Sequence, residues 1–177
     1  MRALKKCAAR LLIGAVGIYL VSPACAQSQQ SRSQPEKIAL PITYKNTEYG
    51  FCFSLPAGWK GYSIVREKWD GRANIDPKGE MTVAQGPIVT IRHPSWVPEV
   101  PRQDIPIMVF TRAQWRSVQQ WKFLVSTAPF GPGEIGRNSR YVFALPPRYN
   151  YAFPPGYEEV QQIMRSDPLL APCGSKQ

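Results

Sequence analysis

The sequence predicts an α+β domain built from a largely antiparallel sheet with two helices packed on it. Short segments in which apolar and polar residues alternate recur between Gly and Pro turn signals, which is typical of β-strands. Two other segments carry apolar residues at helical spacing instead. Most connections are too short for the crossovers that parallel strands require, so the strands are expected to pair antiparallel.

The predicted strands lie at residues 42–45, 51–55, 62–68, 88–92, 105–110, 123–126 and 141–145. In the second of them, Phe51, Phe53 and Leu55 alternate with other residues, which predicts a strand buried on one face. Residues 105–110 are continuously apolar, as expected of a central strand covered on both faces. Residues 130–138 are rich in Gly and Pro and are expected to form a hairpin connection.

Two helices are expected. The first begins at Thr111, whose spacing to Gln114 matches a capping box. The second covers residues 156–165, where apolar residues recur at helical spacing, and Pro168 follows its end.

The first 26 residues have the pattern of a secretory signal peptide. Four cations precede an uncharged apolar run at residues 11–21, which is too short for a hydrocarbon core of about 30 Å. Residues 24–26 read A-C-A and match the A-x-A cleavage pattern, so we expect a mature chain that begins at Gln27. Lipidation at Cys25 and an uncleaved anchor are the alternatives.

The remaining chain divides into a linker and one domain. Residues 27–37 are polar, have no apolar periodicity and are expected to be disordered. Residues 38–177 fit the size of a single α+β domain. We therefore expect a periplasmic or secreted protein whose contact with the membrane is limited to the transient signal segment.

Cysteine usage agrees with export. Removal of residues 1–26 leaves two of the four cysteines, Cys52 and Cys173. In an oxidising compartment this pair is expected to form a disulfide. Two free thiols or a redox-active pair are the alternatives, although the C-x-x-C spacing that tunes redox thiols is absent.

Charge and composition exclude several classes of function. The formal net charge is +10, of which four cations lie in residues 1–26, so the mature chain is moderately basic. Its Lys and Arg residues are scattered and match no nucleic-acid-binding motif, so nucleic acid is not an expected partner. A single His and scattered Cys residues cannot build a structural metal site, and we expect neither metal nor cofactor.

Residues 44–59 read Y-K-N-T-E-Y-G-F-C-F-S-L-P-A-G-W. This segment resembles the opening of PsbP-like domains, which begin with an aromatic turn, a Y-G-F-x-F strand and a P-x-G-W turn. The resemblance implies an antiparallel sheet sandwiched by helices and a non-catalytic extracytoplasmic role in binding or assembly. The residues themselves predict that the apolar positions of this strand enter the core and that Trp59 closes its edge.

The first candidate binding site lies in a proline-rich loop that contains the single His of the chain. Its residues are polar or aromatic, and they are Arg92, His93, Trp96, Arg102 and Asp104. Loops held on a rigid sheet commonly carry binding groups, and prolines reduce the entropy lost on ordering them. The structural alternative is that these side chains cap a strand, bond within turns and cover the sheet.

The second candidate binding site is Tyr149, Asn150 and Tyr151, where aromatic faces and an amide can stack on a sugar or clamp a peptide. No catalytic residues are assigned. A small hydrolase would need His93 to act as a base oriented by a carboxylate such as Asp104, yet no G-x-S-x-G elbow is present. We therefore expect a non-catalytic binding or accessory module of the envelope with a protein or glycan partner. The alternatives are that hydrolase and a basic glycan- or nucleic-acid-binding module.

Overall fold

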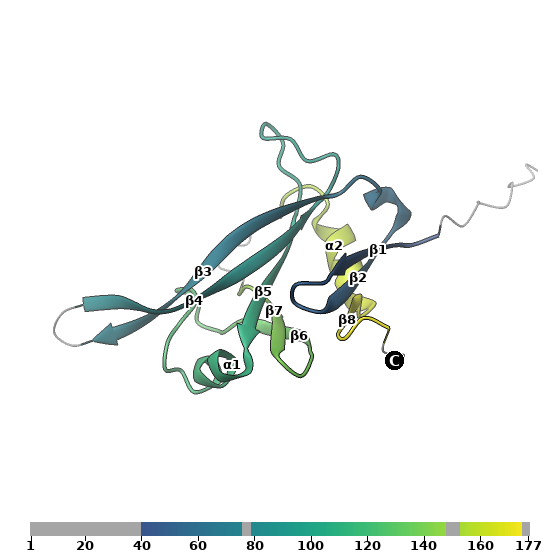
Figure 1. Cartoon of the computed structure of the whole chain (residues 1–177). Coiled ribbons are helices and arrows are strands. Elements are labelled where there is room, and N and C mark those ends of the chain that lie inside the picture. The colour runs from purple at the N-terminus through teal and green to yellow at the C-terminus, as the bar shows by residue number, and fades with distance from the viewer. Residues whose placement is uncertain (1–39, 76–78, 148–152, 175–177) are drawn as a thin grey trace, which may run out of the picture. The chain divides into compact units, whose positions relative to one another are not determined.

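The computed structural model describes residues 40–75, 79–147 and 153–174, which belong to one compact unit and form an α+β fold (Figure 1). The strands form two sheets, and all their described pairings are antiparallel. No helix in these residues is long and apolar enough to cross a membrane. The predicted signal peptide and linker lie outside the described residues.

The smaller sheet has the strand order β1-β2-β8. Its strands are β1 (Ile42–Asn46), β2 (Phe51–Leu55) and β8 (Leu169–Leu170), and the 3-10 helix η1 (Ala57–Trp59) follows β2. Cys52 of β2 and Cys173 form the expected disulfide, with a Sγ–Sγ distance of 2.09 Å. A closure of this length restricts the unfolded chain by about 4–5 kcal/mol in the chain-entropy model.

The larger sheet has the strand order β3-β4-β5-β7-β6. Its strands are β3 (Ser63–Ile75), β4 (Gly79–Arg92), β5 (Ile105–Thr111), β7 (Tyr141–Leu145) and β6 (Gly133–Arg137). Two helices complete the described fold, α1 (Arg112–Gln119) and α2 (Tyr157–Arg165). Both helices were expected, and the predicted capping box is confirmed because Thr111 and Gln114 each bond the other's backbone N–H.

Buried side chains form two clusters on opposite faces of the larger sheet. Along β5, Ile105, Ile107 and Val109 join the first cluster, whereas Met108 and Phe110 join the second. The first cluster also contains β2 and α2 side chains, and the second contains side chains of α1. The prediction that residues 105–110 form a strand covered on both faces is therefore confirmed.

The expectation of one sheet was wrong, and so were several strand boundaries. The β3–β4 hairpin is longer than predicted and extends past its pairing with β5 (Figure 1). In that extension Met81 and Val83 are exposed, so no buried face imposes alternation on the sequence. The two-residue strand β8 was not predicted, because it is too short to show a period.

Two connections were also assigned wrongly. Residues 123–126 do not form a strand, since only Leu124 pairs there, through a bridge to Arg72. The predicted hairpin connection at 130–138 contains the edge strand β6. Gly136 of that strand packs closely against Leu169, since a Cβ there would lie 2.7 Å from Leu169 Cδ2 and would displace the end of that side chain.

Candidate functional site

The residues of the first candidate site divide into two groups. Arg92, at the end of β4, makes a two-pronged ion pair with Asp104, in which Nε and Nη2 both donate to Oδ2, at 3.0 and 2.8 Å. The Arg92 guanidinium also lies 3.9 Å from the centre of the Trp96 ring. This cation–π contact and the ion pair fix the loop between β4 and β5 at both ends.

His93 and Arg102 belong to a second group, which we call the His93 cluster and define as Trp59, His93, Arg102 and Glu159. The Trp59 indole donates to Glu159 Oε1 at 3.0 Å, and Arg102 Nη2 donates to Glu159 Oε2 at 2.9 Å. The His93 ring packs edge-on against Trp59, with ring centres 4.9 Å apart. The cluster thus joins η1, the β4–β5 loop and α2.

The protonation of His93 is set by its surroundings. Its Nδ1 accepts a hydrogen bond from the Ser95 backbone N–H at 3.0 Å, so the neutral ring carries its proton on Nε2. Burial lowers the pKa of His93, and the positive charge of Arg102 lowers it further, while Glu159 opposes them. The ring is therefore neutral at pH 7 and presents an N–H donor.

This arrangement does not supply the parts of a hydrolase. The Nδ1 lone pair of His93 is already used, and its Nε2 is protonated, so the neutral ring offers no free proton acceptor to a nucleophile. Asp104 is held by Arg92, and both oxygens of Glu159 accept hydrogen bonds. Asp104 and Glu159 are thus occupied in structural contacts.

The second candidate site, Tyr149, Asn150 and Tyr151, lies outside the described residues. Within the described residues, no three His, Cys, Asp or Glu side chains gather where they could hold a metal ion. No buried side-chain nitrogen or oxygen among them lacks a hydrogen-bond partner. The polar interior is therefore satisfied by the protein's own contacts.

A third region, which the sequence analysis did not select, begins where α1 ends. The Trp121 N–H donates to the Val118 carbonyl at 3.0 Å, and the Lys122 N–H donates to the Ser117 carbonyl at 3.0 Å. This is the Schellman pattern of helix termination, and Trp121 occupies its left-handed position with φ of 57°. Glycine is usual there, because an L side chain costs about 1–2 kcal/mol in this conformation.

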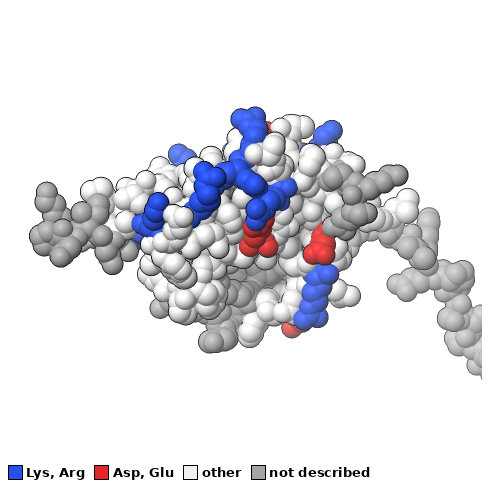
Figure 2. Space-filling view, turned by 90° about the horizontal axis from the view of Figure 1, so that it is seen from below, with Lys and Arg blue, Asp and Glu red and all other residues white. Residues whose placement is uncertain are grey.

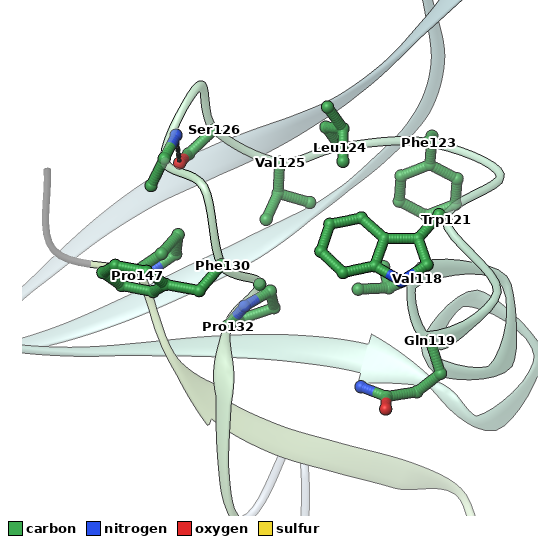
Figure 3. A pocket seen from close by; sticks show the side chains of 12 residues that line it. Val118, Gln119, Trp121, Phe123, Leu124, Val125, Ser126, Phe130, Pro132 and Pro147 are labelled. Atoms are coloured by element: carbon green, nitrogen blue, oxygen red, sulfur yellow. Dashed lines mark hydrogen bonds between the residues drawn. The ribbon is translucent and has the colours of Figure 1, made fainter.

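The Trp121 side chain is 61% exposed and forms one wall of a pocket of about 170 Å³. Figure 3 shows the indole on one side of this pocket, with Phe130 and Pro147 on the opposite side and Val125 between them. We call it the Trp121 pocket; its lining residues are Val118, Gln119, Trp121, Phe123, Leu124, Val125, Ser126, Ala128, Phe130, Gly131, Pro132 and Pro147. Most of these side chains are apolar, and none of them is charged.

Backbone hydrogen bonds and aromatic packing hold one wall of the pocket in place. Leu124 and Arg72 exchange two backbone hydrogen bonds, at 2.7 and 2.8 Å, which pin the loop after α1 to strand β3. Phe123 is buried and stacks on Trp69 with an interplanar angle of 12°. The Phe123 ring also lies over Gly71, where a Cβ would come within 2.5 Å of it. The pocket is therefore built before any ligand arrives, which reduces the entropic cost of binding.

Sequence reasoning missed this pocket for a specific reason. Trp121 follows Trp115 and Val118 at intervals of three residues, a spacing that places all three on one helical face. The helix ends at Gln119, however, and the positive φ turns the Trp121 side chain outward. The only available signal was a Trp between the polar residues Gln120 and Lys122, which is not diagnostic by itself.

Comparisons with models of protein families, with characterised proteins and with solved structures gave no match to this chain. The function is therefore argued from the geometry of its own residues.

Proposed function

We propose that this chain is an exported, non-catalytic binding module that captures a partner through the Trp121 pocket. The observation that carries the proposal is the placement of a large exposed aromatic residue at a backbone position that favours glycine. Strained conformations of this kind cluster at functional sites, where the gain in binding offsets their cost. A structural role would be served better by glycine, because the exposed indole adds little burial.

The size of the pocket supports a single apolar group as its occupant. A cavity of ~150 Å³ in another protein holds one benzene ring, and the Trp121 pocket has a similar volume of about 170 Å³. Among the described lining residues, the amide of Gln119 and the hydroxyl of Ser126 are the polar side chains beside the Trp121 indole, and the Ser126 hydroxyl already accepts the Ala128 N–H. A sugar ring with several hydroxyls would be poorly satisfied there, so an aromatic or aliphatic side chain fits better.

Export is supported by the pattern of residues 1–26 and by the Cys52–Cys173 disulfide, since such bonds persist in oxidising compartments. We further propose that the fold is a PsbP-like α/β/α sandwich. Phe51 and Trp59 of the resembling segment are buried, and α1 and α2 side chains pack on opposite faces of the larger sheet. Both features agree with the architecture that the resemblance implies.

The test is a titration of the oxidised protein with N-acetyl-phenylalanine amide, followed by the NMR signals of the five Trp indole N–H groups. We expect the Trp121 signal, identified by its loss in Trp121→Phe, to shift the most. Phe130→Ala should abolish this shift because it removes the opposite wall. Phe153→Ala is the matched control, since Phe153 is similarly exposed (56% against 52%) but lies outside the pocket.

A shift that survives in Phe130→Ala, or a larger shift at another Trp, would place binding elsewhere and contradict the proposal. Absence of any shift up to the solubility limit of the amide would contradict it as well.

A further inference from the structure

We infer that the partner of the Trp121 pocket is an acidic polypeptide segment that inserts one large apolar side chain and lays its flanking residues across the adjoining surface. This inference rests on the proposed function and adds the chemical class of the partner. Two observations carry it: a second hollow that adjoins the pocket, and the sign of the charges around both.

The second hollow, of about 440 Å³, shares one wall with the pocket. The shared residues are Leu124, Val125, Ser126 and Pro147. The two hollows are therefore neighbours that adjoin the same stretch of chain. Neighbouring hollows suit an extended chain, which buries one anchor and carries further residues beside it.

The charges around the two hollows are mostly positive. Residues 111–133, which form most of the pocket, include Arg112, Arg116 and Lys122 but no Asp or Glu. Of the described residues that line the adjoining hollow, Lys68 and Arg72 are cationic and Asp70, which accepts a hydrogen bond from Gln85, is anionic. Figure 2 views the face that lies below in Figure 1, where α1 is found, and shows Lys and Arg side chains in a row with few acidic ones between them.

Charge complementarity of this kind speeds encounter and selects partners of opposite sign. Carboxylates on both sides of the anchor would meet this rim, whereas cations there would be repelled. An anionic membrane would meet the same charges, but a bilayer surface cannot fill a concave pocket of one-ring size as a single side chain does. An acidic polypeptide is therefore the partner that fits both the apolar pocket and the positive charges around it.

The experiment compares three labelled peptides on the oxidised protein by fluorescence anisotropy at low salt. The first is acetyl-Asp-Glu-Phe-Asp-Glu-amide, the second replaces its acids with Asn and Gln, and the third replaces its Phe with Ala. We expect the first to bind at least tenfold more tightly than either of the others. Its advantage over the amide peptide should shrink at 1 M salt, where charges are screened beyond about 3 Å.

A charge-reversal variant and a matched control test whether the positive charge near the pocket attracts the acidic peptide. Lys122→Glu should weaken the acidic Phe peptide at least threefold and leave the amide peptide unchanged. Lys60→Glu, which makes the same change of charge at an exposed residue outside both hollows, should affect neither peptide.

The other possible outcomes would each contradict the inference, and they can be told apart. Equal binding of the acidic and amide peptides would remove the acidic partner but leave the proposed pocket intact. Equal binding of the acidic Phe and Ala peptides would show that no side chain is anchored. Binding to phosphatidylglycerol vesicles, measured in parallel by co-sedimentation, without binding of any peptide would make the surface a membrane contact. Failure of every peptide together with N-acetyl-phenylalanine amide would remove the proposed function too.

Discussion

The His93 cluster and the Trp121 pocket differ in how their side chains are used. In the cluster, the indole of Trp59, the guanidinium of Arg102 and both oxygens of Glu159 satisfy one another. In the pocket, Trp121 and Phe130 remain more than half exposed, and the backbone of Trp121 has a positive φ. The charged and hydrogen-bonding side chains of the His93 cluster therefore stabilise the fold through contacts with one another. The large side chains that remain exposed at the Trp121 pocket are apolar.

This difference indicates which of the two regions is the better candidate for binding a partner. Polar groups that are already paired gain little from a ligand, because a new hydrogen bond replaces an existing one. Apolar surface held exposed on a rigid loop gains from any partner that covers it. Stability and peptide binding, measured on the same variants, distinguish the two regions.

The largest effect is expected from substitution of Gly71, which lies against the Phe123 ring that lines the Trp121 pocket. In Gly71→Ala the new Cβ would lie 2.5 and 2.7 Å from two atoms of the buried Phe123 ring. Overpacking of this kind should lower the free energy of unfolding by about 3 kcal/mol and weaken the acidic Phe peptide as well. Urea denaturation measures the first effect. Gly58→Ala is the control, because its Cβ would meet nothing within 4 Å, and it should change neither quantity.

The second effect isolates the His93 cluster. Glu159→Ala leaves the indole N–H of the buried Trp59 without its acceptor, so we expect a loss of about 2 kcal/mol in the free energy of unfolding. Glu158→Ala controls for the helix dipole, since both residues lie in the first turn of α2. Peptide binding should be unchanged in both variants. A loss of peptide binding in Glu159→Ala would mean that the two regions are coupled.

The third effect measures the strain at Trp121. Both Trp121→Gly and Trp121→Ala remove the indole and should abolish peptide binding. Only glycine adopts the left-handed conformation freely, so Trp121→Gly should be more stable than Trp121→Ala by about 1 kcal/mol. Equal melting temperatures for the two variants would show that the backbone at this position is not strained.

The smallest effect is a pH dependence that belongs to the cluster alone. Because the pKa of His93 is lower in the folded than in the unfolded protein, the unfolded state binds a proton first as the pH falls. Stability is therefore full above the unfolded pKa of about 6.5 and decreases as the pH falls from there to the folded pKa, below which the loss is complete. His93→Gln should remove this slope in urea titrations between pH 5 and 7. Binding of N-acetyl-phenylalanine amide should stay constant over that range, since none of the described residues that line the pocket titrates there.

Local signals in the sequence account for much of the fold. Alternation predicted β2 and β7, the Thr111 capping box predicted α1, and the apolar run at 105–110 predicted the central strand, because each pattern reports a buried face or an unsatisfied helix end. Prediction failed where no such pattern exists. The outer part of the β3–β4 hairpin covers no core. In β6, Gly136 lies close to Leu169, a contact that no local pattern shows.

The candidate sites show the same limit. The proline-rich loop with Arg92 and His93 stands out in the sequence as a concentration of polar and aromatic groups. Its partners Trp59 and Glu159 lie far away in the sequence, so that stretch could not show that the groups are already paired. The exposure of Trp121 follows from where α1 ends and from its left-handed backbone, and no pattern in the sequence shows either.

Local patterns were enough to predict the α+β class and the strongly periodic strands and helices, and the cysteine count made a Cys52–Cys173 bridge the expected pairing among alternatives. The division of the strands into two sheets, the joining of Trp59 and Arg102 by Glu159 and the exposure of Trp121 became visible only in the folded molecule. The physical reason is that exposure and pairing depend on neighbours brought together by folding. A side chain's type sets what it can bind, and the packing around it sets whether it is free to do so.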